Sequence, residues 1–188
     1  LKDRDGVTLE EALIETGFKG DSTGPGRAVH AAFEFHIEQG PVLDSKNITI
    51  GIPAGIVCVR WYDIEINGEA NHAGSTPMDL RFDPMCSFAE MCQHIRKIAV
   101  ENGGMVATVG EVHVEPNSRN VIPARVGFTI DIRGWDEDLV DRGCAEIEVA
   151  LQRVADEQGC RLVIGNVWKE SRTKFNAELT SLIRQVSE

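Results

Sequence analysis

The sequence has no long apolar run, and this lack excludes a membrane-spanning helix. No stretch approaches the roughly 18 consecutive apolar residues that a span requires, and 26% of the 188 residues are charged. Basic residues are also scarce, since 19 Lys and Arg stand against 30 Asp and Glu, for a formal net charge of -11. Such a negative field repels phosphate groups, so we expect neither nucleic acid nor a membrane as a partner.

Cysteine occurs only as five scattered residues, an odd number that excludes a fully paired disulfide framework. They form no Cys-x-x-Cys pair, which argues against a structural zinc knot. This usage is typical of a reducing compartment, and we expect a cytoplasmic protein. Because the first residue is Leu rather than Met, we also expect the chain to be an internal part of a longer protein. The cysteines are Cys58, Cys86, Cys92, Cys144 and Cys160.

The first 58 residues predict one helix, one strand and a hinge. Thr8 followed by Glu11 is a capping box, and Gly17 supplies a stop, so a helix is expected over about 9–16. Alternating residues over 33–38 predict a strand that ends at Gly40-Pro41. The run 48–61 contains two glycines and a proline, a composition typical of a hinge, and we place a domain boundary there.

The middle of the chain predicts strands and helices in the order β-α-β-β-α-β. Asp83 and Pro84 have the residue types of a helix N-cap and first position, and a second helix is expected from Asp136. Residues 125–133 alternate strictly between apolar and polar, as in a half-buried strand. This order is that of the ferredoxin-like split βαβ motif, an α+β fold with two helices on one face of an antiparallel sheet. The last residues, from about 169, contain one helix and are expected to return to the first domain.

Three short segments carry residues with chemical potential. His36 lies in His-Ile-Glu-Gln-Gly-Pro at an expected strand end, where an imidazole can ligate Zn, Mn or Ni or can simply hydrogen-bond to the backbone. His72 lies among small residues in Asn-His-Ala-Gly-Ser-Thr-Pro-Met. It can donate a hydrogen bond to an oxyanion, or it can simply be a solvated residue of a tight turn. Asn120 and Arg133 can clamp a carboxylate, although an Asp131-Arg133 surface pair explains the same pattern.

Together these segments resemble a known enzyme family across essentially the whole chain. The resemblance rests on the combination of His-Ile-Glu-Gln-Gly-Pro, Gly-x-Ala-x-His-Ala-Gly-Ser-Thr-Pro-Met, and Pro-Asn-x-x-Asn-Val-Ile-Pro with Asp-x-Arg. The chain resembles N-carbamoyl-L-amino-acid hydrolases, beta-ureidopropionases and allantoate amidohydrolases. These form a branch of the M20 metallopeptidase-like group. The resemblance implies a catalytic α/β metallohydrolase domain interrupted by a lid that also forms a homodimer. Partial catalytic segments are then expected at 1–58 and 169–188, and the ferredoxin-like lid at 59–168.

The same resemblance implies a role for each matching residue. His36 matches a metal ligand, and Gln39 a glutamine that contacts the substrate. His72 matches a catalytic lid histidine that hydrogen-bonds the carbamoyl group or stabilises its oxyanion. Asn120 and Arg133 match residues that hold the substrate carboxylate, and the resemblance leaves open whether the lid residues act in their own site or in the partner subunit's site. The expected substrate is a small ureido or N-carbamoyl amino acid, including allantoate, whose C–N bond is cleaved with release of ammonia.

The sequence departs from the family pattern in its metal ligands. The resemblance implies two divalent metals (Zn, Mn, Ni or Co) per full-length subunit, but the family's other ligand motifs and its general base have no counterpart here. The site in this chain is therefore incomplete, and we expect the isolated fragment to be inactive. Two alternatives stay open: an M20-type peptidase or deacylase of N-acyl amino acids, and, for the fragment alone, a non-catalytic dimerisation module.

Overall fold

The computed structural model describes residues 2–3, 5–21, 26 and 28–187, which fall into two compact units, 1–48 and 49–188. Each unit is described by itself. The domain boundaries expected at 58/59 and 168/169 stay a prediction. None of the helices in the described part of the chain is long and apolar enough to cross a membrane.

The first unit contains two short helices. Helix α1 spans Leu9–Glu15, and the predicted capping box is confirmed: Thr8 Oγ1 accepts from the Glu11 N–H at 3.2 Å, and the Glu11 carboxylate accepts from the Thr8 N–H at 2.7 Å. Helix α2 spans Val42–Ser45. The strand predicted over 33–38 is wrong, because those residues adopt no regular structure and the Phe35 side chain is fully exposed.

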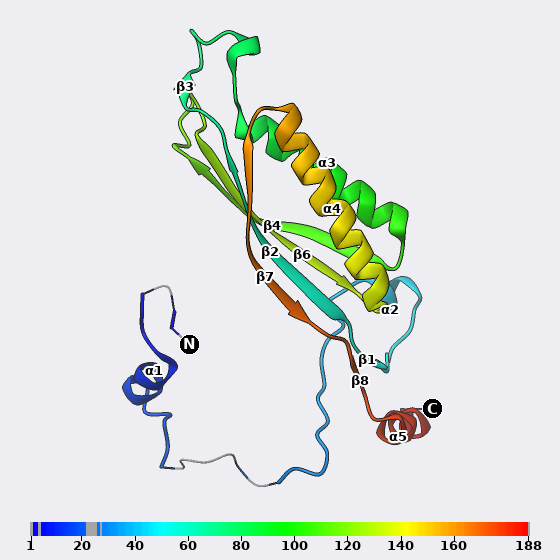
Figure 1. Cartoon of the computed structure of the whole chain (residues 1–188). Helices are drawn as coiled ribbons and strands as arrows, with labels where there is room; N and C mark the ends of the chain where they lie inside the picture. Colours follow the sequence, from blue (N-terminus) through cyan, green and yellow to red (C-terminus); the bar gives the residue numbers. More distant parts are fainter. Residues whose placement is uncertain (1, 4, 22–25, 27, 188) are drawn as a thin grey trace. The chain divides into compact units, whose positions relative to one another are not determined.

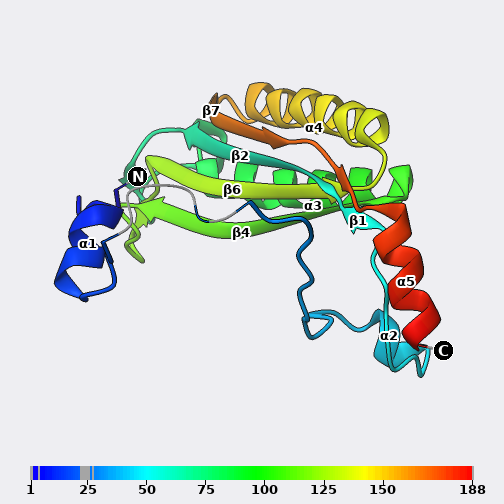
Figure 2. The same cartoon turned by 90° about the horizontal axis from the view of Figure 1, so that it is seen from below.

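The second unit is built on a four-stranded antiparallel sheet in the order β4-β6-β2-β7, which Figure 2 shows side by side. Helix α3 connects β2 to β4, and helix α4 connects β6 to β7. The expectation of a mixed helix and sheet domain is confirmed. The bounds are β2 Cys58–Asn67, α3 Pro84–Asn102, β4 Met105–Glu115, β6 Arg125–Gly134, α4 Glu137–Glu157 and β7 Arg161–Glu170.

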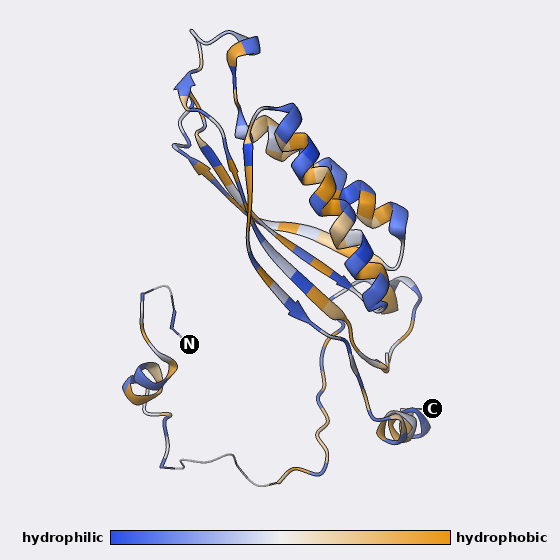
Figure 3. Ribbon diagram, in the orientation of Figure 1, coloured by the Kyte–Doolittle hydropathy of each residue, from blue (hydrophilic) through white to orange (hydrophobic). Residues whose placement is uncertain are grey.

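Both long helices begin where their capping residues predict. The Asp83 carboxylate accepts from the Met85 N–H at 2.9 Å, with Pro84 in the first turn, and the Asp136 carboxylate accepts from the Leu139 N–H at 3.1 Å. These side chains satisfy backbone donors that the first turn leaves free. Figure 3 shows that each helix carries an apolar stripe and a polar stripe, as expected for helices that cover a sheet.

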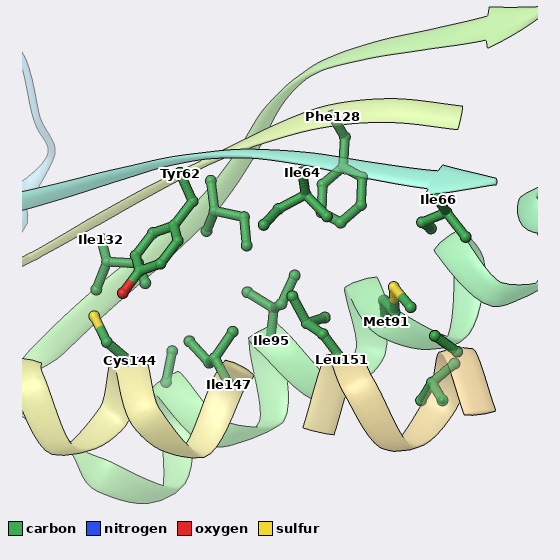
Figure 4. Packing of buried hydrophobic residues seen from close by; sticks show 14 of the residues in the cluster. Tyr62, Ile64, Ile66, Met91, Ile95, Phe128, Ile132, Cys144, Ile147 and Leu151 are labelled. Carbon is green, nitrogen blue, oxygen red and sulfur yellow. The ribbon is translucent and has the colours of Figure 1, made fainter. Parts of the chain in front are cut away.

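One core lies between the two helices and the sheet. Alternate residues of β2 and β6 point toward the helices, and their partners on α3 and α4 are fully buried, as Figure 4 shows. The opposite set of β6 side chains, which includes Arg133, therefore projects from the face of the sheet away from the helices. The core includes Tyr62, Ile64, Ile66, Met91, Ile95, Phe128, Ile132, Cys144, Ile147 and Leu151.

Two small strand pairs lie outside the main sheet. Strands β1 (Gly55–Ile56) and β8 (Thr173–Lys174) pair just before β2 and just after β7 in the chain. Strands β3 (Asn71–His72) and β5 (Val121–Ile122) pair beyond the other end of the sheet. Figure 1 shows β3 at the upper end of this unit and β1 and β8 at the lower end. A 3-10 helix, Met78–Leu80, follows β3, and helix α5 spans Ala177–Ser187.

Candidate functional site

The β3–β5 pair brings His72 next to Asn120. His72 is in register with Val121, and the Ala73 N–H donates to the Asn120 carbonyl at 3.0 Å. The two residues are 48 positions apart in the sequence, yet the backbone fixes them on adjoining segments. Both side chains are exposed. The pair forms what we call the tip of the domain, and the sequence had named both residues without showing that they meet.

Each side chain at the tip has an acceptor atom already occupied. His72 Nδ1 accepts from the backbone N–H groups of Gly74 and Ser75 at 3.1 and 3.2 Å. The Asn120 side-chain oxygen accepts from the Ser118 hydroxyl at 2.9 Å. The remaining polar groups of the two side chains are the other imidazole nitrogen and the amide NH₂, both suited to donate hydrogen bonds to a substrate oxygen.

Arg133 lies near the opposite end of the sheet, where its guanidinium meets Asp131. Arg133 Nε donates to Asp131 Oδ1 at 2.9 Å and Nη2 donates to Oδ2 at 2.6 Å. The hydrogen bonds from Arg133 lower the pKa of Asp131, and the Asp131 carboxylate raises the pKa of Arg133. The surface pair that sequence analysis offered as an alternative therefore exists. A bidentate contact through Nε and Nη2 still leaves Nη1 for a carboxylate.

The tip and Arg133 are far apart within one chain. Arg125, the first residue of β6, is in register with Asn67 at the tip end, and Arg133 lies eight residues further along the strand. At about 3.3 Å per residue this separation is roughly 26 Å. The carbamoyl and carboxyl carbons of an N-carbamoyl α-amino acid are three bonds apart, less than about 5 Å. A molecule of that size therefore cannot contact the tip and Arg133 of the same chain at once.

The first unit holds His36 and Gln39 in an exposed segment. His36 Nε2 lies 2.6 Å from Glu34 Oε1, and both side chains are largely exposed. Gln39 has a φ of 56°, in the left-handed region, at the turn into α2. Within the described part of the chain, no group of three or more His, Cys, Asp or Glu residues is placed to hold a metal ion. These residues by themselves thus do not fit the metal pair that the resemblance implies.

Sequence reasoning missed Glu38 as a capping residue. Its carboxylate accepts from the N–H groups of Val42 and Leu43 at 2.8 and 2.9 Å, which satisfies the free donors at the start of α2. The signal was an acidic residue shortly before a short helix. Ser118, which fixes the Asn120 amide, gave no signal, because its contact depends on the conformation of the loop.

The fold and these motifs define a class, a mixed helix and sheet domain that matches a known family model. The family model described as "Peptidase dimerisation domain" matches residues 58–159, more than half of the chain. The chain belongs to this M20 peptidase dimerisation domain family.

Two relatives and one solved structure that resemble the chain are amidohydrolases or amidases. The chain is 35% identical over 188 residues to an N-carbamoyl-L-amino-acid amidohydrolase of Rhizobium meliloti, covering 100% of this chain and 45% of the relative. It is 33% identical to the allantoate amidohydrolase of Escherichia coli, covering 99% and 46%. A crystal structure of an amidase of the hydantoinase/carbamoylase family from Burkholderia vietnamiensis aligns with a TM-score of 0.88 at 36% identity, covering 99% and 45%. The chain spans less than half the length of the curated relatives it matches.

Proposed function

We propose that this chain is part of a homodimeric amidohydrolase that cleaves the ureido C–N bond of N-carbamoyl-L-amino acids or allantoate and releases ammonia. The observation that carries the proposal is the β3–β5 pair, which holds His72 beside Asn120 as exposed donors at one end of a sheet, with Arg133 near the other. The names of the relatives support the reaction class. The free state of the described cysteines supports a cytoplasmic location.

Residues 59–168 would form the ferredoxin-like lid and dimerisation domain. The strand order β4-β6-β2-β7 with α3 and α4 as connections supports this topology, because the first and third of the four strands (β2 and β6) lie in the centre and the second and fourth (β4 and β7) lie at the edges. Residues 1–58 and 169–188 would belong to the catalytic α/β domain. The paired strands β1 and β8 lie where the chain enters and leaves the lid, and they support a two-strand connection between the domains.

The substrate would be held by two subunits. Because Arg133 and the tip are roughly 26 Å apart, we infer that Arg133 acts in one subunit's site while His72 and Asn120 of the partner reach the same substrate. A two-fold axis makes both sites of a dimer equivalent under this arrangement. A dimerisation domain would then carry substrate-binding residues at both ends of its sheet.

Each residue would contribute a distinct contact. The Arg133 guanidinium, oriented by Asp131, would bind the substrate carboxylate through its remaining N–H groups. The Asn120 amide would donate to a substrate oxygen, and His72 would donate to the carbamoyl oxygen, where negative charge develops. Gln39 would contact the substrate from the catalytic domain. His36 would be one ligand of a metal pair that would supply Lewis acidity, and the other ligands would have to come from outside the described residues.

The rival within the same fold is a peptidase or deacylase of N-acyl amino acids. A longer protein that contains this chain and its flanking catalytic sequence should be assayed with N-carbamoyl amino acids, allantoate and N-acetyl amino acids at matched concentrations. Turnover of a carbamoyl or ureido substrate with ammonia release supports the proposal. Exclusive turnover of the N-acetyl substrates would favour the peptidase branch, and a stable dimer without hydrolysis of any of them would favour a dimerisation module.

A further inference from the structure

The turn after His72 folds back onto the histidine itself. The Thr76 N–H and Thr76 Oγ1 donate to the His72 carbonyl at 3.2 and 2.8 Å, which closes a turn over residues 72–76. Inside this turn, the N–H groups of Gly74 and Ser75 both point at His72 Nδ1. The backbone conformation therefore surrounds one ring nitrogen with donors.

Two donors at one nitrogen determine the tautomer of a neutral imidazole. Such a ring has one N–H donor and one acceptor nitrogen, and the hydrogen bond made by one nitrogen fixes which of them carries the proton. Because Nδ1 accepts from both Gly74 and Ser75, the ring proton of His72 lies on Nε2. The side chain then presents an N–H donor to a ligand, and it recognises an oxygen rather than an amine or amide N–H.

Gly74 has a direct part in this geometry. A Cβ atom at position 74 would lie 3.2 Å from His72 Cε1 and 3.5 Å from His72 Nδ1. The first distance is tighter than ordinary van der Waals contact, so a larger residue would push the ring away from the donors. The absence of a side chain at position 74 therefore leaves room for the imidazole of His72.

Arg81 braces the turn from outside. Its Nε donates to the Thr76 carbonyl at 3.1 Å, and its Nη2 donates to the carbonyls of Ala73 and Thr76 at 2.7 and 2.9 Å. The side chain is half-buried. The planar guanidinium therefore connects both ends of the segment that carries the Gly74 and Ser75 donors, while the segment itself is exposed to solvent.

We propose that Arg81 and Gly74 are positioning residues that hold His72 as an Nε2–H donor for a substrate carbonyl oxygen. The role at the substrate rests on the proposed function, whereas the tautomer is a property of this chain alone. Neither residue touches the substrate in this account. They act by keeping the ring in the one orientation and protonation form that can donate.

The first test is a long-range ¹H–¹⁵N correlation spectrum of the ¹⁵N-labelled chain, with the His72 signals assigned by His72→Gln. We expect Nδ1 to behave as an unprotonated acceptor and Nε2 as a protonated nitrogen. Arg81→Ala and Gly74→Ala should each shift these signals toward a mixture of the two tautomers. Arg142→Ala, at an exposed arginine of α4, should leave them unchanged. A protonated Nδ1 in the unaltered chain would overturn the proposal, whether or not any variant folds.

The second test uses the longer protein. Arg81→Ala should lower kcat and kcat/KM together by roughly tenfold, since a displaced donor weakens a contact made mainly in the transition state. Arg81→Lys, which keeps a positively charged donor group but not the planar fork, should recover part of the loss, and Arg142→Ala should have no effect. An unchanged kcat in Arg81→Ala would overturn the positioning role. If the protein hydrolyses no ureido substrate, the proposed function fails, while the nitrogen spectra still decide the tautomer.

Discussion

Arg60 is a buried cation, and removing its acidic partner Asp141 should lower the free energy of unfolding by a measurable amount. It lies on the helix side of β2 with its side chain 5% exposed, and its guanidinium donates to both oxygens of Asp141 on α4, at 2.8 and 3.3 Å. Nη1 donates to the carbonyls of Val59 and Glu170 at 2.9 Å each. The change Asp141→Asn keeps the shape of the pair but leaves the guanidinium charge uncompensated.

The expected cost follows from the exposure of each partner. Removing one member of a fully buried ion pair costs about 3 to 5 kcal/mol. The Asp141 side chain is 49% exposed, so water can solvate part of the site, and we expect Asp141→Asn to lower the free energy of unfolding by about 2 kcal/mol. In an Arg60→Met background no cation is left, and the same change should cost less than about 0.5 kcal/mol.

Urea unfolding of the chain, followed by far-UV circular dichroism, measures all four members of this cycle. The slope m should stay the same while the midpoint shifts. Asp63→Asn, an exposed residue of the same strand, is the matched control and should change stability by less than about 0.5 kcal/mol. An equal cost of Asp141→Asn in both backgrounds would show that the contact with Arg60 contributes nothing to stability, and the reasoning would be refuted.

Three further outcomes are expected. The hydrogen bond and charge of Arg60 lower the pKa of Asp141 in the folded protein below its usual 3.8. The stability that the Arg60–Asp141 pair contributes is therefore fully present above pH 3.8, and it is lost as the pH falls through the lowered pKa of Asp141 in the folded protein. Asp141→Asn should flatten the acid limb of a stability-versus-pH curve. Gly55→Ala places a Cβ 2.1 Å from the Thr173 carbonyl and should speed amide exchange in β1 and β8, measured by mass spectrometry. Leu151→Ala, at 1% exposure, should cost about 3 kcal/mol in urea unfolding, whereas Val149→Ala, at 71% exposure, should cost less than about 0.5 kcal/mol.

Element ends and the sheet of the second unit could be predicted because the signals are local. A cap such as Asp83 before Pro84 acts on the next turn, and the alternation of 125–133 needs only a core on one side. The strand predicted over 33–38 failed for the opposite reason. Alternation there is genuine in the sequence, but a strand also needs a partner backbone, and no pairing partner is described for those residues.

The site could be predicted as a set of residues but not as an arrangement. The motifs named His72, Asn120 and Arg133, but the two-residue strands β3 and β5 are too short to produce a periodic signal. The contact between His72 and Asn120 therefore appears only with the structure, as does the distance of both from Arg133. The brace at Arg81 was equally invisible, because it consists of backbone carbonyls that any sequence would supply.

The central claim is that Arg133 of one subunit and the tip of its partner hold one substrate. Two inactive variants of the longer protein, His72→Ala and Arg133→Ala, should be mixed under conditions that exchange subunits. Half of the dimers are then mixed, and each carries one intact site, so we predict recovery of about a quarter of the unaltered activity. Mixing His72→Ala with Asn120→Ala should recover none, because each of the two sites in a mixed dimer then receives one defective tip. No recovery in the first mixture, with subunit exchange verified, would contradict the account.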